Sequence, residues 1–148
     1  MSKQKIMKWA LLALLLSSLT FELMPGSVTY YADNTIMSPE TAWNFFTVPT
    51  ESAAASYLVV AGTVTALAAI LALVAVCFRK PNLYRAVGWS SLIASALAAA
   101  PYLVKPEGKI LHPNVIVLIL LLVCWFLAMS LDKSKDEKKK VQAPTNRL

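Results

Sequence analysis

Residues 115–131, with the sequence VIVLILLLVCWFLAMSL, contain no charge and decide what kind of protein this chain can form. Twelve of these residues are Leu, Ile, Val or Phe, which together contribute about −4 to −7 kcal/mol to membrane insertion. A helix needs about 20 residues, range roughly 17–25, to cross the hydrocarbon core of a bilayer. The stretch therefore predicts a spanning helix over residues 113–131.

Three further apolar segments resemble it, with at most one charged residue each. They predict spanning helices over residues 9–24, 56–78 and 82–104, of which the first is short at roughly 24 Å. The expected fold is an all-α membrane protein: a four-helix transmembrane bundle, with a small external subdomain of short strands and a helix between the first two spans.

The composition excludes several other classes of protein. Of the 148 residues, 57% are hydrophobic and 15% charged, whereas a soluble domain has about 45–50% and roughly 25%. The net charge of +6 does not indicate nucleic-acid binding, because the basic residues flank apolar segments and form no single patch. Cys77 and Cys124 lie in separate apolar runs and suggest no disulfide or zinc framework.

The distribution of lysine and arginine predicts the orientation of the bundle. Twelve of the fourteen basic residues lie in or beside segments 1–8, 79–81 and 132–148, whereas residues 25–55 have none. The positive-inside rule places the basic side in the cytoplasm. Both termini are then cytoplasmic, residues 25–55 form an external loop, residues 105–112 form an external turn, and the basic tail 132–148 is expected to be disordered.

The first apolar segment has a second interpretation. Three lysines followed by an apolar run also fit the start of a secretory signal peptide. The best small-residue cleavage site, Ser18-Leu19-Thr20, is a poor one, so a retained helix is favoured, and cleavage stays as the alternative. A cleaved chain would keep three spans with the same loop orientation.

The external loop has its own local signals. Val28, Thr29, Tyr30 and Tyr31 have strand-like composition, and Ser38-Pro39-Glu40 is typical of a helix start. Aromatic side chains in the loop either form a ligand-binding or adhesive surface or anchor the loop at the lipid headgroups, and anchoring is favoured. These side chains are Tyr30, Tyr31, Trp43, Phe45 and Phe46.

Small residues recur at four-residue spacing in the second and third spans. Such faces allow two helices to approach closely, and we expect them to pack within the chain, with self-assembly as the alternative. The predicted packing residues are Ala61, Gly62, Thr65, Ala66 and Ala69 in one span, and Ser91, Ala94, Ser95, Ala98 and Ala99 in the other.

Glu22 is the ionisable residue closest to the membrane interior. Carboxylates within a membrane commonly serve proton or cation coupling, so Glu22 is a candidate functional carboxylate. The alternative, which we favour, is that it reaches the outer headgroups and pairs with Lys105, Lys109 or His112, because Pro25 ends the helix nearby. No spacing of ligands or nucleophiles predicts a metal site, a cofactor or a catalytic centre.

Two stretches carry a resemblance to known sequences. Lys8-Trp9-Ala10-Leu11-Leu12 and Phe21-Glu22-Leu23-Met24-Pro25-Gly26-Ser27-Val28 resemble short uncharacterised four-span membrane proteins of Gram-positive bacteria, across the first helix and the external loop. The resemblance implies a plasma-membrane protein of unassigned role, and it transfers no functional residues.

These observations lead to two expectations for function. The first is a non-catalytic membrane protein: an accessory subunit, scaffold or immunity-type factor that acts on an unknown membrane partner. The alternative is a small transporter or channel formed by self-association. A pathway for solutes should be marked by polar groups at mid-membrane, and the spans offer mainly hydroxyls.

Overall fold

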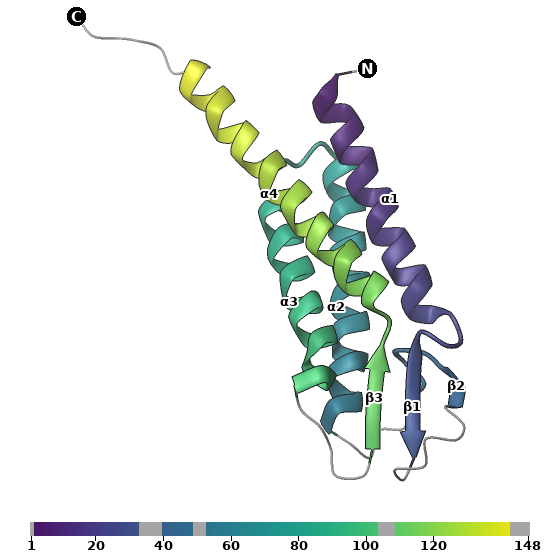
Figure 1. The fold of residues 1–148 in the computed structure, drawn as a ribbon. Coiled ribbons are helices and arrows are strands. Elements are labelled where there is room, and N and C mark those ends of the chain that lie inside the picture. Colours follow the sequence, from purple (N-terminus) through teal and green to yellow (C-terminus); the bar gives the residue numbers. More distant parts are fainter. Residues whose placement is uncertain (1, 33–39, 49–52, 104–108, 143–148) are drawn as a thin grey trace, which may run out of the picture.

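Four long helices and one small sheet make up the computed structural model, which describes residues 2–32, 40–48, 53–103 and 109–142. The helices pack side by side, and the sheet lies at the end of the bundle opposite both termini (Figure 1). The helices are α1 (Lys3–Leu23), α2 (Ala53–Cys77), α3 (Leu83–Leu103) and α4 (Val115–Gln142).

Each helix is long and apolar enough to cross a membrane, so the prediction of four helices of spanning length is confirmed. Among the helix starts, that of α1 differs most from the prediction, because α1 begins at Lys3 and not at residue 9. Ser2 explains this early start, since its side chain accepts a hydrogen bond from the backbone N–H of Lys5 and so caps the first turn. With these extra turns α1 has 21 residues, which is long enough to cross the hydrocarbon core, whereas the apolar segment 9–24 alone is too short.

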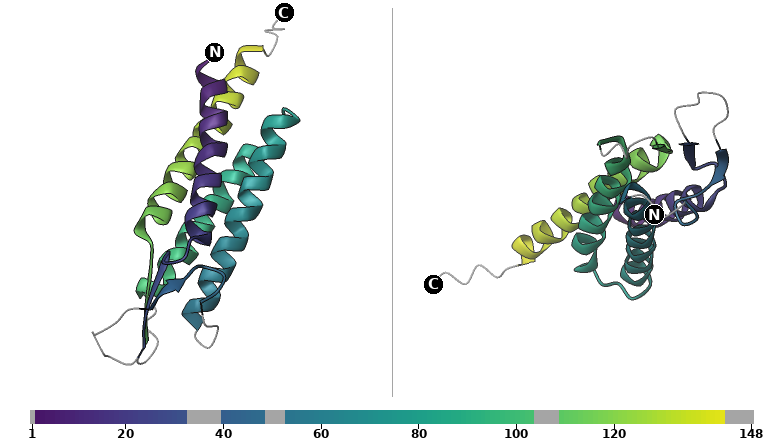
Figure 2. Two further views of the ribbon diagram at one scale, coloured as in Figure 1. Left: turned by 90° about the vertical axis from the view of Figure 1, so that its right-hand side faces the viewer. Right: turned by 90° about the horizontal axis from the view of Figure 1, so that it is seen from below.

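Small side chains of α2 and α3 are buried in the bundle together with leucines of α1, α2 and α4, and other large apolar side chains cover its outside. The most extensive contact joins α2 and α3, and α1 packs between α4 and α2 (Figure 2). Ala61 and Ala98 are fully buried, whereas Ile70 is 59% exposed and Phe126 is 66% exposed. This arrangement is typical of helices in a bilayer. Burying apolar surface between helices gains little free energy there, because lipid is equally apolar, so the helices associate through close packing of small residues.

The tight turn between α2 and α3 closes with a helix-terminating motif. Arg79 adopts a left-handed conformation (φ 51°), and the Lys80 N–H donates to the carbonyl of Ala75. The hydrogen bond from Lys80 back to Ala75 is typical of a Schellman motif. In that motif the left-handed position, here Arg79, usually holds glycine. The turn brings the start of α3 directly beside the end of α2.

The helix α4 continues well past its apolar segment. The prediction of a disordered tail from residue 132 is wrong as far as Gln142, where the helix ends. Lys, Glu and Gln are good helix formers, and contacts to α1 hold the extension. The Gln4 side-chain amide donates to the Ser134 hydroxyl at 3.0 Å, and the Lys138 ammonium donates to the Gln4 carbonyl oxygen at 2.8 Å.

The sheet has three antiparallel strands in the order β2-β1-β3: β1 (Val28–Ala32), β2 (Glu40–Trp43) and β3 (Lys109–Pro113). The strand predicted around Val28 is confirmed. The helix predicted to start at Ser38-Pro39-Glu40 is wrong where the structure describes it, since Glu40 begins a strand and residues 38–39 lie outside the described part. The turn predicted at 105–112 is also wrong from Lys109 onward, because β1 pairs with this segment over five residues.

Hydrogen bonds join the sheet to the helix ends. Gly26 has a positive φ of 86°, which reverses the chain after α1, and its N–H donates to the Trp43 carbonyl at 3.0 Å. The Asn114 N–H, at the start of α4, donates to the Ser27 carbonyl at 2.8 Å. The Tyr102 hydroxyl, from the end of α3, donates to the carbonyl of Pro113. The sheet is therefore fixed to three of the four helices.

Candidate functional site

Glu22, in the last turn of α1, is fully buried. The expectation that it reaches the headgroups is wrong, and the reason is the chain that folds back over the end of α1. The Phe45 N–H donates to the Glu22 carbonyl at 3.1 Å, and the Ser27 hydroxyl donates to the same oxygen at 3.2 Å. A position near a helix end is thus covered by the loop that follows it.

Thr65 of α2 is the direct partner of the Glu22 side chain. Its hydroxyl lies 2.8 Å from Glu22 Oε1 and 3.0 Å from the Ala61 carbonyl oxygen. One hydroxyl proton serves one acceptor well. The Thr65 hydroxyl donates to Glu22 Oε1, and the Ala61 carbonyl oxygen is a second acceptor within reach of the same hydroxyl.

Two buried polar atoms beside this contact have no hydrogen-bond partner within the described residues. They are Glu22 Oε2 and the Ser18 hydroxyl oxygen, which lie one helical turn apart on the same face of α1. Buried polar groups are nearly always satisfied, so each unpaired one requires an explanation. Ser18, Glu22 and Thr65 therefore form the polar cluster with the strongest claim to a function within the spans. Of these three, sequence reasoning singled out Glu22 as a functional carboxylate and Thr65 as a packing residue, and it named Ser18 only within a candidate cleavage site.

The predicted small-residue faces lie mostly inside the bundle. Ala66 and Ala99 are half-buried, and the rest are buried: Ala61, Gly62, Thr65, Ala69, Ser91, Ala94, Ser95 and Ala98. The Ser91 hydroxyl donates to the Val87 carbonyl at 2.8 Å, within its own helix. A close approach that the sequence reasoning missed involves Gly88, where an added Cβ would lie 3.0 Å from the Met129 sulfur of α4.

Gly62 receives an aromatic ring from the loop that precedes α2. A Cβ added at Gly62 would lie 2.5 Å from Cζ of Phe46 and 2.9 Å from Cε2, closer than real Cβ contacts come. Phe45, beside it, is fully buried, so its predicted place in an external aromatic surface is wrong. Trp43 and Phe46 are half-buried. The backbones of Tyr30 and Tyr31 lie in β1, and their side chains are outside the described part.

We expect Gly62→Ala to lower the free energy of unfolding by about 1–3 kcal/mol, because the added methyl group must displace the Phe46 ring. Thermal unfolding in detergent measures the loss. In a Phe46→Ala background, the same change at Gly62 should cost almost nothing, since the ring is gone. An equal loss in both backgrounds would show that Gly62 does not hold Phe46.

Metal ligation finds no support in the described residues, among which no group of three or more His, Cys, Asp or Glu could hold an ion. The side chain of His112, one of the proposed partners of Glu22, lies outside the described part, as does that of Lys109. Lys105 lies wholly outside it.

The architecture, four apolar helices with a polar cluster inside, is that of a multi-pass membrane protein. Comparison with family models, with curated proteins and with solved structures finds no match to this chain.

Proposed function

We propose that the chain is a plasma-membrane protein with both termini in the cytoplasm and the sheet outside. Lysines lie in the first turns of α1, basic residues follow α2, and the α4 extension carries more, all at the end of the bundle where the termini lie. The positive-inside rule favours this orientation. The packing of α1 between α4 and α2, with Leu11 and Leu15 fully buried, supports a helix that is retained and not cleaved as a signal peptide.

Within that orientation the protein acts as a non-catalytic partner of another membrane protein: an accessory subunit, a scaffold or an immunity-type factor. The observation that carries this proposal is the docked sheet. A crossing helix needs only a short connection to the next, yet here the chain builds three paired strands and bonds them to the ends of α1, α3 and α4. A rigid surface beyond the spans suits recognition, since binding loses less entropy when its surface is ordered beforehand.

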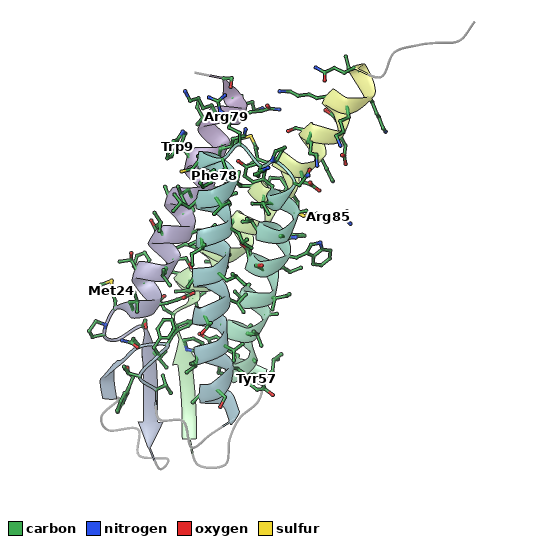
Figure 3. The ribbon with its side chains drawn as sticks, turned by 180° about the vertical axis from the view of Figure 1, so that it is seen from behind. Trp9, Met24, Tyr57, Phe78, Arg79 and Arg85 are labelled. Carbon is green, nitrogen blue, oxygen red and sulfur yellow. The ribbon has the colours of Figure 1, made fainter. Side chains whose placement is uncertain are left out.

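Site-directed photo-crosslinking in native membranes tests the proposal. Tyr57 is 37% exposed on the first turns of α2, close to the sheet (Figure 3), so the larger side chain of p-benzoylphenylalanine can extend outward from this position. Trp89, 50% exposed on α3 nearer the other end, is the matched aromatic control. We expect a defined protein adduct from position 57 and lipid adducts alone from position 89. Lipid adducts alone at both positions would contradict recognition at the sheet end.

The second candidate, a transporter or channel formed by self-association, has one observation in its favour. Glu22 Oε2 and the Ser18 hydroxyl are buried polar atoms with no partner in the described part of the chain, and intramembrane carboxylates often serve ion or proton pathways. Ion flux into liposomes that contain the purified protein distinguishes the candidates. Flux that disappears in Glu22→Gln, together with crosslinks from one copy to another, would favour the transporter.

A further inference from the structure

The carboxyl group of Glu22 is buried without a counter-charge. Of the carboxyl side chains that the structure describes, that of Glu22 alone is fully buried. Its only hydrogen-bond partner in the described part of the chain is the Thr65 hydroxyl, 2.8 Å from Oε1, and Oε2 has none. An ionised carboxylate is costly to bury unless it is paired. The geometry therefore favours the neutral acid, with its proton on Oε2.

Two serine hydroxyls near Glu22 do not bond to its carboxyl group. The Ser27 hydroxyl donates to the main-chain carbonyl of Glu22 at 3.2 Å. The Ser18 hydroxyl, one helical turn earlier on the same face of α1, has no partner within the described residues. Hydrogen bonds to a charged acceptor are the stronger ones, so an ionised carboxylate would attract these donors. In the acid form Oε2 is itself a donor, and the Ser18 oxygen is an acceptor on its own face of the helix.

The helices packed against α1 offer Glu22 no cation. These helices are α4 and α2, and neither α2 nor α4 as far as Leu131 contains a charged residue. Their titratable groups are Tyr57 and Cys77, which are exposed, and Cys124, which is buried. On α1 itself the nearest charge is that of Lys8, fourteen residues earlier or roughly 21 Å along the helix. The titratable side chains of the sheet, which lie outside the described part, are those of Tyr30, Tyr31, Glu40, Lys109 and His112.

Residues 44–48 cover the end of α1 where Glu22 lies, and none of them is titratable. The N–H of the buried Phe45 donates to the Glu22 carbonyl at 3.1 Å, and the Asn44 side-chain amide donates to the Leu23 carbonyl at 3.1 Å. The Phe46 ring packs on α2 at Gly62, less than one turn before Thr65. Moving this segment away from the helix end therefore gives water access to the carboxyl group.

We propose that Glu22 is a proton-binding site, which holds its proton while residues 44–48 cover it and releases the proton when they move away. A proton is a ligand that needs no cavity, so a closed site suits it. A glutamate in water is ionised above about pH 4.3, so each opening releases one proton and becomes more favourable as the pH rises. The site thereby couples pH to the docking of the segment that joins the sheet to α2. It requires only the bundle, and is independent of the partner recognition and ion transport considered above.

Infrared spectroscopy of the protein in nanodiscs, with isotope-labelled glutamate, tests whether Glu22 carries the proton. At neutral pH we expect the carbonyl stretch of a protonated carboxylic acid, shifted by the label and absent from Glu22→Gln. Glu137→Gln, a change at an exposed glutamate of α4, is the matched control and should keep the band. Carboxylate bands alone in the wild type at neutral pH would overturn the proposal and assign a bound cation to Oε2.

Hydrogen exchange of the Phe45 amide tests the coupling to opening. Beyond the ordinary base-catalysed increase, its rate should rise by up to about tenfold per pH unit, the limit for release of one proton. Glu22→Gln cannot ionise and should show the base-catalysed increase alone. So should the wild-type Lys80 amide, bonded to the Ala75 carbonyl at the other end of the bundle, and this comparison needs no variant that folds. An equal pH dependence of the Phe45 and Lys80 amides would overturn the proposed coupling.

Discussion

Glu22→Ala is expected to lower the free energy of unfolding by about 2–5 kcal/mol, the range for Met→Ala, a truncation of similar length. The side chain is fully buried and bonded to Thr65, so alanine leaves a cavity between α1 and α2. Glu22→Gln should cost much less, because the amide keeps the volume and an oxygen that Thr65 can contact. Thermal unfolding in detergent measures both changes.

Thr65→Val separates the hydrogen bond from the packing at this site. Interhelical hydrogen bonds in membranes average about 0.6 kcal/mol, with a maximum of roughly 1.7, so this variant should lose far less stability than Glu22→Ala. Equal stability of Glu22→Ala and the wild type would contradict a buried Glu22.

Ala69→Leu is expected to lower the free energy of unfolding by about 1–3 kcal/mol, and by more if the helices cannot move apart. Ala69 is 6% exposed on α2, the helix that makes the most extensive contact in the bundle, with α3. The extra carbons have no space there and must separate the two helices.

Ile70→Leu is the matched control for this overpacking, because the neighbouring residue is 59% exposed on the outer surface of the same helix. It should leave the unfolding temperature nearly unchanged. If both variants unfold at the same temperature, the face around Ala69 is not the packed one.

The four spans could be predicted from the sequence because insertion depends on local composition alone. The run 115–131 needs no knowledge of the rest of the chain to be recognised as apolar. The small-residue faces could be predicted for the same reason, since four-residue spacing places Ala61, Thr65 and Ala69 on one side of a helix.

Features that depend on distant contacts could not be predicted. Ile110 and Leu111 are too short an apolar run to indicate a strand, and they become one only because β1 pairs with them. The burial of Glu22 depends on Phe45 folding back over α1, and the order of the α4 extension depends on Gln4. Ser38-Pro39-Glu40 has the chemistry of a helix start, but Glu40 pairs with Tyr30 in the sheet.

The pairing of Val28 with Pro113 also has a consequence for biogenesis. During synthesis, β1 leaves the ribosome long before β3, with two hydrophobic helices made in between. The nascent chain must hold β1 with an open edge until β3 has been made, and an open strand edge readily pairs with other chains. The sheet can therefore close only after α2 and α3 have been made, and its closure precedes the synthesis of α4 or accompanies it.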